Sequence, residues 1–287
     1  MEVKIMQSES IYKSPEGEQA IRELYDRGLE HWPVPWKPIN LDTSCGRTFA
    51  VAWGKETAPP MVLLHGSGGN ALAWMPDAVH YEKHFRVYAV DIPGEPGKSV
   101  QIRPEWTSPF YAEWLDEVLD ALGIDKVILG GISLGGWTAL KYALYKPERV
   151  EKLCLVCPGG IYPARFSFVL RSILYLLAGK RGQDRMKRYV FNNRPVPEGL
   201  ALYMDLMAKH YRYRVGSPPV FTDVELRKIT MPLFFLAGAE DVAFHSHKAG
   251  KRLERLLPHA VVKILPGEGH VLLNTGAGIM EFLTDGK

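Results

Sequence analysis

Three residues that together could activate a serine for nucleophilic attack follow separate apolar segments of this chain. Ser133 comes first, Asp241 second and His270 third, each just after a short apolar run. A serine hydroxyl is a poor nucleophile at neutral pH, so it needs an imidazole to accept its proton and a carboxylate to hold that imidazole in the useful tautomer. We therefore predict Ser133 as the nucleophile, His270 as the base and Asp241 as the acid that orients His270.

The residues around Ser133 have the pattern of a strand, a sharp turn and a helix. Val127 to Leu129 is apolar, Gly131 to Gly135 reads Gly-x-Ser-x-Gly, and helix-forming residues follow. A serine on such a strained turn needs neighbours without a Cβ atom, because strand and helix approach each other closely there. The order Ser, Asp, His along the chain is also the order in enzymes with this elbow.

Other histidines and acids were candidates for the same roles. His65 precedes a glycine-rich loop, and we expect it to brace that loop rather than act as the base. His245 and His247 lie beside a helix start, with no strand end before them. Glu240 is the alternative acid, and Asp241 is preferred because the shorter acid is the commoner partner of a catalytic histidine.

A glycine-rich loop after the apolar run at 61–64 could supply backbone donors. The oxyanion that forms when a serine attacks a carbonyl needs preorganised N–H groups. The elbow pattern assigns one to Leu134, and we predict the N–H of Ser67 as the second, with Gly68 next. Gly66 and Gly68 are expected to border the substrate. A plain turn or a phosphate cradle is the alternative, but the lysine of a phosphate-binding loop is missing.

Apolar segments that predict buried strands alternate with segments that predict helices. This alternation indicates parallel βαβ units, with a sheet in the middle and helices on both faces. The expected strands are residues 47–53, 61–64, 85–90, 127–129, 150–156, 231–238 and 260–265. The expected helices are residues 14–32, 107–122, the segment after Ser133, 166–177, 246–257 and a closing helix that includes 279–283. Residues 32–38 are predicted as a connector or rim, because their prolines exclude regular helix; a polyproline ligand is the less favoured interpretation.

The composition is that of an ordinary globular protein. The chain has 287 residues, of which 46% are hydrophobic and 23% are charged, and its formal net charge is +3. This net charge is only a mild basic bias, far from that of nucleic-acid binders, so no nucleic-acid partner is expected. Charged residues interrupt the first residues after Met1, so we expect no secretory signal and no membrane anchor, and we predict residence in the cytoplasm.

The three cysteines give neither a disulfide framework nor a zinc pattern. Cys154 and Cys157 have redox-motif spacing but lie at the end of an apolar run, so core or strand-end cysteines are the favoured interpretation. No second pair of cysteines or histidines stands at zinc spacing, so we expect no metal and no cofactor. Cys157-Pro158 also leaves no acid at the end of the strand after the elbow, which removes the main competing position for the acid.

The regular alternation stops between residues 159 and 222. Phe166 to Leu177 is almost entirely apolar and too short to span a bilayer, so we expect a buried or cleft-facing helix. Basic residues then cluster between 180 and 214. A solvated helical face is the preferred interpretation of that cluster, ahead of recognition of an anionic ligand or a membrane surface.

From about residue 64 onward, residues 159–222 excepted, the sequence resembles the α/β-hydrolase superfamily, and most of all its bacterial serine carboxylesterases. The matching landmarks are His65-Gly66-x-Gly68, Asp91-x-Pro93-Gly94, Gly131-x-Ser133-x-Gly135, Asp241 and Gly269-His270. The resemblance implies a central, mostly parallel sheet flanked by helices, built from residues 1–158 and 223–287, and a helical cap at 159–222. Glu95 to Ser99 departs from the shorter glycine-serine turn that is common in the family.

The resemblance and the triad residues together predict a serine hydrolase that cleaves small-molecule carboxylic esters through an acyl-enzyme, without stable membrane association. Thioester hydrolysis, carbon–carbon cleavage and perhydrolysis are other reactions of the same machinery. A small-molecule receptor that kept the fold and lost catalysis is a further alternative, which the retention of Ser133, Asp241 and His270 disfavours. The natural substrate and the oligomeric state are not indicated by the sequence.

Overall fold

A single eight-stranded sheet organises the protein, whose computed structural model describes residues 10–214 and 216–284. The strands are β1 (Trp36–Thr43), β2 (Gly46–Trp53), β3 (Pro60–Leu64), β4 (Arg86–Val90), β5 (Val127–Ile132), β6 (Val150–Val156), β7 (Leu233–Gly238) and β8 (Ala260–Leu265). Their order across the sheet is β1-β2-β4-β3-β5-β6-β7-β8. Strands β1, β2 and β4 pair antiparallel, and all further pairs are parallel. The predicted mostly parallel α/β sheet is confirmed.

Strand β1 was not predicted, because its sequence contains a proline. Pro38 has no N–H group to donate to a neighbouring strand, so proline is tolerated mainly on edge strands. β1 is an edge strand of this sheet, and its residues are half-buried or exposed except Leu41, which is buried. The connector expected at residues 32–38 therefore ends at Trp36, where the strand begins.

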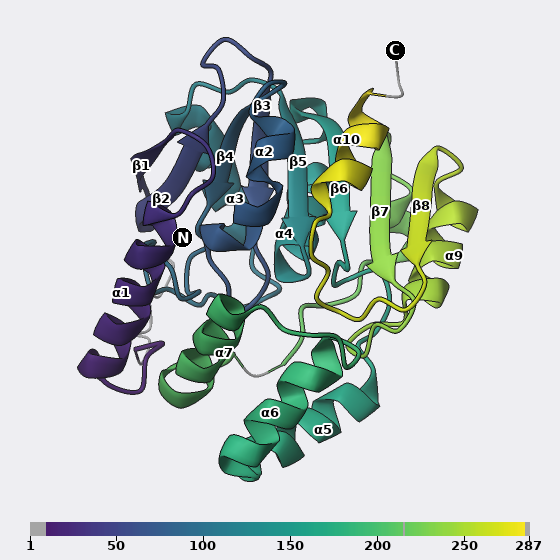
Figure 1. The fold of residues 1–287 in the computed structure, drawn as a ribbon. Helices are drawn as coiled ribbons and strands as arrows, with labels where there is room; N and C mark the ends of the chain where they lie inside the picture. Colours follow the sequence, from purple (N-terminus) through teal and green to yellow (C-terminus); the bar gives the residue numbers. More distant parts are fainter. Residues whose placement is uncertain (1–9, 215, 285–287) are drawn as a thin grey trace.

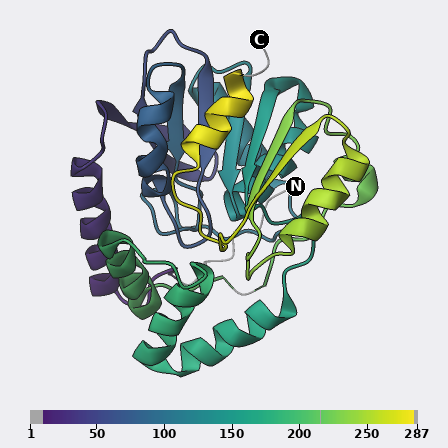
Figure 2. The same cartoon turned by 45° about the vertical axis from the view of Figure 1, so that its right-hand side comes forward.

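Helices cover both faces of the sheet (Figures 1 and 2). The α-helices are α1 (Pro15–Glu30), α2 (Ala78–Tyr81), α3 (Phe110–Ala121), α4 (Leu134–Tyr145), α5 (Phe166–Leu177), α6 (Gly179–Val190), α7 (Glu198–His210), α8 (Asp223–Leu226), α9 (Ser246–Leu256) and α10 (Gly276–Thr284), and the 3₁₀ helices are η1 (Ala71–Asp77) and η2 (Pro147–Arg149). The connection from β3 to β4 crosses the sheet in the opposite direction to those from β4 to β5, β5 to β6 and β7 to β8. Because such crossovers are right-handed, α2 lies on one face, and α3, α4 and α9 lie on the other. Helix α10 packs beside α2.

The parallel strands all end at one edge of the sheet, and the residues that follow β5, β7 and β8 lie there. Helices α5, α6 and α7, which come between β6 and β7 in the chain, lie beyond this edge at the bottom of Figure 1. Their contact with the edge is direct, since Val190 O at the end of α6 accepts the backbone N–H of His270 at 3.0 Å. Ser133, Asp241 and His270 therefore lie at the edge of the sheet beyond which α5, α6 and α7 are found.

Helix α5 is not buried, contrary to one of the two expectations for this segment. Six of its large apolar side chains lie on one helical face and are between 42% and 79% exposed: Phe166, Val169, Leu170, Ile173, Leu174 and Leu177. The opposite face of α5 packs on α6, where Phe168 and Tyr175 contact Tyr189. Hydrophobicity alone predicts burial, but among the described residues α6 is the main element against which α5 packs.

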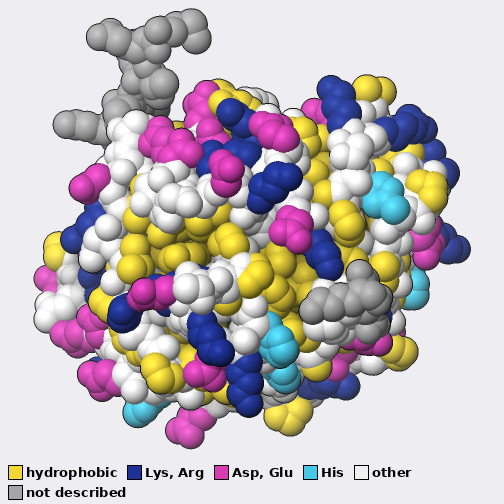
Figure 3. Space-filling model, turned by 90° about the horizontal axis from the view of Figure 1, so that it is seen from above, with side chains coloured by type: hydrophobic (Ala, Val, Ile, Leu, Met, Phe, Trp, Pro, Cys, Tyr) yellow, Lys and Arg dark blue, Asp and Glu magenta, His cyan; other side chains and the backbone are white. Residues whose placement is uncertain are grey.

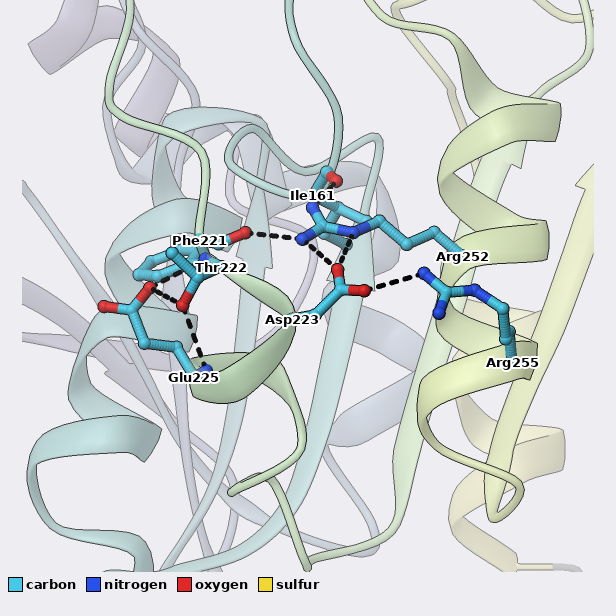
Figure 4. Close-up of polar contacts among 7 residues, drawn as sticks. All are labelled: Ile161, Phe221, Thr222, Asp223, Glu225, Arg252 and Arg255. Atoms are coloured by element: carbon cyan, nitrogen blue, oxygen red, sulfur yellow. Dashed lines mark hydrogen bonds and ion pairs between the residues drawn. The ribbon is translucent and has the colours of Figure 1, made fainter.

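One arginine of α9 fastens both ends of the segment that contains α5, α6 and α7 (Figure 4). Arg252 donates to Ile161 O at 2.5 Å, to Phe221 O at 2.8 Å and, from Nε at 2.9 Å, to Asp223 Oδ1. Arg255 binds the other carboxylate oxygen of Asp223 at 2.8 Å. The point where the chain leaves the sheet region and the point where it returns are therefore held by the same guanidinium group.

The exposed charges on the described surface are of both signs. Figure 3 shows the molecule from the side that is uppermost in Figure 1, where Lys and Arg side chains are interspersed with Asp and Glu. Among the residues that the structure describes, no helix is both long and apolar enough to cross a membrane.

Candidate active site

Ser133 occupies a strained position between β5 and α4. Its backbone has φ +50° and ψ −105°, and its N–H donates to Val156 O at 2.9 Å. A Cβ atom on Gly131 would overlap the backbone of Gly135, and a Cβ atom on Gly135 would overlap the backbone of Leu64. The two glycines of the pentapeptide are therefore required by close backbone approach, as the sequence analysis predicts.

His270 and Asp241 come together across the ends of β7 and β8. His270 Nδ1 lies 2.9 Å from Asp241 Oδ2, and the Asp241 side chain is fully buried. The other oxygen, Oδ1, accepts the N–H groups of Ala243 at 2.7 Å and Phe244 at 2.9 Å. With the carboxylate fixed in this way, His270 Nδ1 carries the proton that it donates, which leaves Nε2 as an acceptor.

The electrostatics of this pair favour a charged imidazole. Burial alone would lower the pKa of His270, but the Asp241 carboxylate beside it raises this pKa above the ordinary histidine value. Burial likewise opposes ionisation of Asp241, and its pKa is nevertheless lowered by His270 and by the amides of Phe244 and Ala243. A carboxylate placed in this way stabilises an imidazolium that forms when the histidine takes up a proton.

Phe244 and Gly159 connect this pair with Ser133. The rings of Phe244 and His270 lie 5.5 Å apart, between their centroids. The position of a Cβ atom on Gly159 would be 3.5 Å from Phe244 Cζ and 3.8 Å from Ser133 O. Gly159 N–H also donates to Ser133 O at 3.1 Å. The nucleophile candidate and the His270–Asp241 pair thus lie around the same short stretch of chain.

The loop after β3 folds over Ser133. Gly69 N–H donates to Gly66 O at 3.0 Å, and Gly68 has φ +70°, as in a type II turn. A Cβ atom on Gly66 would lie 3.5 Å from Ser133 Cβ, so the turn borders the serine directly. Leu134 is the first residue of α4, and the N–H groups of a first helical turn have no acceptor within their helix.

His65 is bonded to the backbone through both of its ring nitrogens. Nδ1 lies 2.8 Å from Gly66 O, and Nε2 accepts the N–H of Ile92 at 2.9 Å. Burial lowers the pKa of His65 to about 4, so it is neutral at physiological pH. This geometry agrees with the expectation that His65 braces the glycine-rich loop.

Glu95 was not predicted as a site residue, yet its carboxylate oxygen Oε2 accepts the N–H of Gly68 at 2.5 Å. Glu95 is 3% exposed and lies in the loop after β4. This carboxylate takes up the Gly68 N–H, whereas no acceptor for the Ser67 N–H is found in the described part of the chain, so Ser67 is the better candidate of the two. The only signal in the sequence was the unusual composition of residues 95–99.

An arginine-rich groove of about 690 Å³ adjoins the acid of the pair. It lies between α5, α6 and the loop after β7, and its lining residues are Arg165, Ser167, Arg171, Tyr175, Arg185, Arg188, Tyr189, Asn192, Asn193, Glu240, Asp241 and Val242. Part of the basic cluster therefore lies near the site. Lys187, in contrast, does not line the groove and pairs with Asp184 and Asp205.

Cys157 lies beside His270 and Asp241. Its thiol, the imidazole and the carboxylate have donor atoms within 4.8 Å of one another, and these three residue types can bind a metal ion. Burial raises the pKa of the Cys157 thiol, which disfavours the thiolate that a metal would need, and both other groups already bond each other. Cys154 and Cys157 are both buried and free, consistent with core cysteines.

Comparison with known proteins identifies similar chains. Residues 61–278 match the protein family described as "Alpha/beta hydrolase family". The "Uncharacterized carboxylesterase nap" of Bacillus subtilis is 31% identical over 259 residues, which cover 87% of this chain and 86% of the relative. The carboxylesterase YbfK of B. subtilis is 29% identical and covers 87% of both chains, and its crystal structure superposes with a TM-score of 0.84 over 95% of this chain and 100% of that one. A 2-hydroxy-6-oxononadienedioate/2-hydroxy-6-oxononatrienedioate hydrolase of Dechloromonas aromatica is 32% identical over 76% of this chain and 81% of that relative.

Proposed function

We propose, since the chain belongs to the Alpha/beta hydrolase family, that it hydrolyses carboxylic esters through an acyl-enzyme formed on Ser133. The observation that carries this proposal is the His270–Asp241 pair, fixed by three hydrogen bonds at the same sheet edge as the strained Ser133. The carboxylesterases among its relatives support esters as the substrate class.

Acylation uses the neutral tautomer of His270. Ser133 Oγ bonds to the carbonyl carbon of the ester while its proton passes to His270 Nε2, and the carbonyl electron pair moves to oxygen. The N–H groups of Ser67 and Leu134 bind that oxyanion. When the oxyanion collapses, the carbon–oxygen bond to the alcohol breaks, and the imidazolium returns its proton to the leaving alkoxide.

Deacylation repeats these steps with water. Water attacks the acyl carbon and gives a proton to His270, the second tetrahedral oxyanion is bound by the same two amides, and Ser133 leaves with the proton from His270. The products are the carboxylic acid and the free serine. Asp241 keeps its charge throughout and stabilises the imidazolium twice in each turnover.

Residues 159–222 are proposed to form a cap that borders the substrate, with residues 1–158 and 223–287 as the catalytic core. The bond from His270 N–H to Val190 O, and the clamp of Arg252 on both ends of the segment, support this division. Cytoplasmic residence is proposed as well, and the three free cysteines are consistent with a reducing compartment.

Hydrolysis of p-nitrophenyl esters of increasing acyl length tests this function. The purified chain should release p-nitrophenol with saturation kinetics, and S133A should lower kcat by about 10³-fold or more, because the variant lacks the nucleophile. A thioester series run in parallel measures the alternative substrate class. Turnover by S133A within tenfold of the parent protein would show that the reaction does not pass through Ser133.

A further inference from the structure

A buried carboxylate outside the triad bonds the loop that carries Ser67. One oxygen of Glu95, Oε2, accepts the N–H of Gly68 at 2.5 Å, the hydroxyl of Tyr211 at 3.0 Å and, more weakly, the hydroxyl of Ser67 at 3.5 Å. The three donors come from the turn after β3 and from the chain after α7. Glu95 therefore joins two segments that are distant in sequence.

The bond from Gly68 fixes the orientation of one peptide group. In a type II turn, the peptide between the two central residues, here Ser67 and Gly68, is rotated by about 180° relative to a type I turn. The Glu95 carboxylate accepts the N–H in the observed orientation, and rotation of this peptide would leave a buried donor and a buried acceptor unpaired. Each unpaired buried group lowers the stability of the rotated form, and more so when the lost partner is charged.

Two tyrosines hold the same glycine from the other side. Tyr203 donates its hydroxyl to Gly68 O at 2.9 Å, and the Tyr213 ring lies 2.9 Å from the position of a Cβ atom on Gly68. Both tyrosines belong to the segment between β6 and β7. Within the turn, the N–H of Gly68 is therefore bonded to Glu95 and the carbonyl of Gly68 is bonded to Tyr203.

The charge of Glu95 is compensated by nearby arginines. Arg103 donates to Tyr211 Oη at 2.6 Å, and burial raises the pKa of Glu95 while the Gly68 bond, Arg103, Tyr211 and Arg214 act to lower it. Burial of a carboxylate is strongly unfavourable unless the group is hydrogen-bonded and paired. An apolar residue could fill the same volume without this penalty. Packing alone therefore does not explain why a carboxylate stands at position 95.

We propose that Glu95 is a positioning residue, which holds the turn at residues 66–69 in its observed form, so that the Ser67 N–H in the adjoining Gly66–Ser67 peptide faces the oxyanion formed at Ser133. It acts through Ser67 and does not contact the substrate. The kinetic part of this proposal rests on the proposed ester hydrolysis, and the positioning itself has a structural readout that is independent of activity.

Steady-state kinetics on three variants test the positioning. E95A removes the acceptor and should lower kcat by about 10- to 100-fold with KM within threefold, because an oxyanion donor acts mainly in the transition state. E95Q should retain most of kcat, since a single carboxamide oxygen can accept all three donors. A trifluoromethyl ketone, which forms a tetrahedral adduct with the serine, should lose affinity in E95A by about the same factor as kcat/KM.

Glu117 offers a matched control. Its carboxylate also accepts a backbone N–H and a serine hydroxyl, those of Ser44, at 2.6 Å and 2.7 Å. Ser44 lies in the turn between β1 and β2. E117A removes the same kind of bonds and should leave kcat and KM unchanged. A loss of activity that is equal in E117A and E95A would assign the effect to general loss of stability.

The structural readout uses a property of the sequence, since Ser67–Gly68 is its only Ser-Gly dipeptide. Protein made by cell-free synthesis with ¹³C-carbonyl serine and ¹⁵N-glycine gives one carbonyl–amide correlation, that of Gly68. Its amide proton should resonate downfield in the parent and E95Q proteins and move upfield by about 1 ppm in E95A, because the short bond to the carboxylate is lost.

Two further results would overturn the proposal. The first is an unchanged Gly68 amide shift in folded E95A, which removes the positioning bond whatever the activity. The second is an E95A variant with parent kcat, in a protein where S133A is inactive, which leaves ester hydrolysis standing and rejects Glu95 alone. If the parent protein itself hydrolyses no ester, the proposed function fails, and the amide shift still decides whether Glu95 holds the turn.

Discussion

Replacing Asp241 with asparagine isolates the role of one hydrogen-bond direction in the candidate site. Oδ1 of Asp241 accepts the N–H groups of Ala243 and Phe244, and Oδ2 lies against His270 Nδ1. If the asparagine oxygen keeps the two backbone N–H groups, its NH₂ group must face His270. Nδ1 of His270 then has to accept, the proton moves to Nε2, and Nε2 can no longer take the proton of Ser133.

The magnitude follows from the cost of turning the asparagine over. The reversed amide would restore the useful tautomer but would lose two backbone hydrogen bonds of about 1 kcal/mol each. About 2 kcal/mol corresponds to roughly 30-fold, so only about 3% of molecules would hold the useful arrangement. D241N should therefore lower kcat by at least about 30-fold, and by up to about 10⁴-fold once the lost stabilisation of the imidazolium is included.

The assay is a p-nitrophenyl ester progress curve over a range of pH, with E240Q as the matched control. Glu240 is the neighbouring acid, and its amide variant should keep kcat within twofold of the parent. Circular dichroism should show D241N folded, because the asparagine oxygen preserves the bonds to residues 243 and 244. A D241N kcat within threefold of the parent, or a large loss in E240Q alone, would refute the assignment of the acid to Asp241.

Three further predictions test other parts of the structure. The pKa of His270 is raised by Asp241, so kcat/KM should increase with pH as the imidazolium loses its proton, and in D241N this ascending limb should move to lower pH; a limb that moves to higher pH would contradict the pairing. G135A should lower the free energy of unfolding in urea by about 3 kcal/mol or more, whereas G199A, where a Cβ atom meets nothing within 4 Å in a helix, should raise it by about 0.5 kcal/mol. R252M should destabilise the protein by about 2 to 4 kcal/mol and speed proteolysis within residues 162–220, because two backbone carbonyls lose a charged donor. R255M loses one exposed bond and should leave the stability and the rate of proteolysis near those of the parent.

The sheet could be predicted because its buried strands are composed mainly of apolar residues. Segments such as 127–132 and 153–156 are apolar on both faces, as expected for parallel strands covered by helices, and the structure places them at the centre. The edge strand β1 could not be predicted in the same way. An edge strand has one unpaired side, so it tolerates Pro38 and has no continuous apolar run.

Much of the candidate site could be predicted because its residues lie in loops at strand ends. Ser133, Asp241 and His270 each follow a strand that apolar residues define, so their meeting at one edge follows from the topology. Glu95 has no such signal, because its contacts with Gly68 and Tyr211 span 27 and 116 residues of sequence. The exposed face of α5 was also unpredictable, since periodicity shows that a helix is amphipathic and not whether a partner covers it.

The most direct test of the central claim is intact-mass spectrometry after incubation with a fluorophosphonate, followed by peptide mapping. We expect one adduct per chain, located on Ser133, absent in S133A and formed far more slowly in H270A. No adduct on the folded parent protein would contradict the proposed catalytic serine, and so would an adduct at another residue in a protein whose S133A variant still hydrolyses esters.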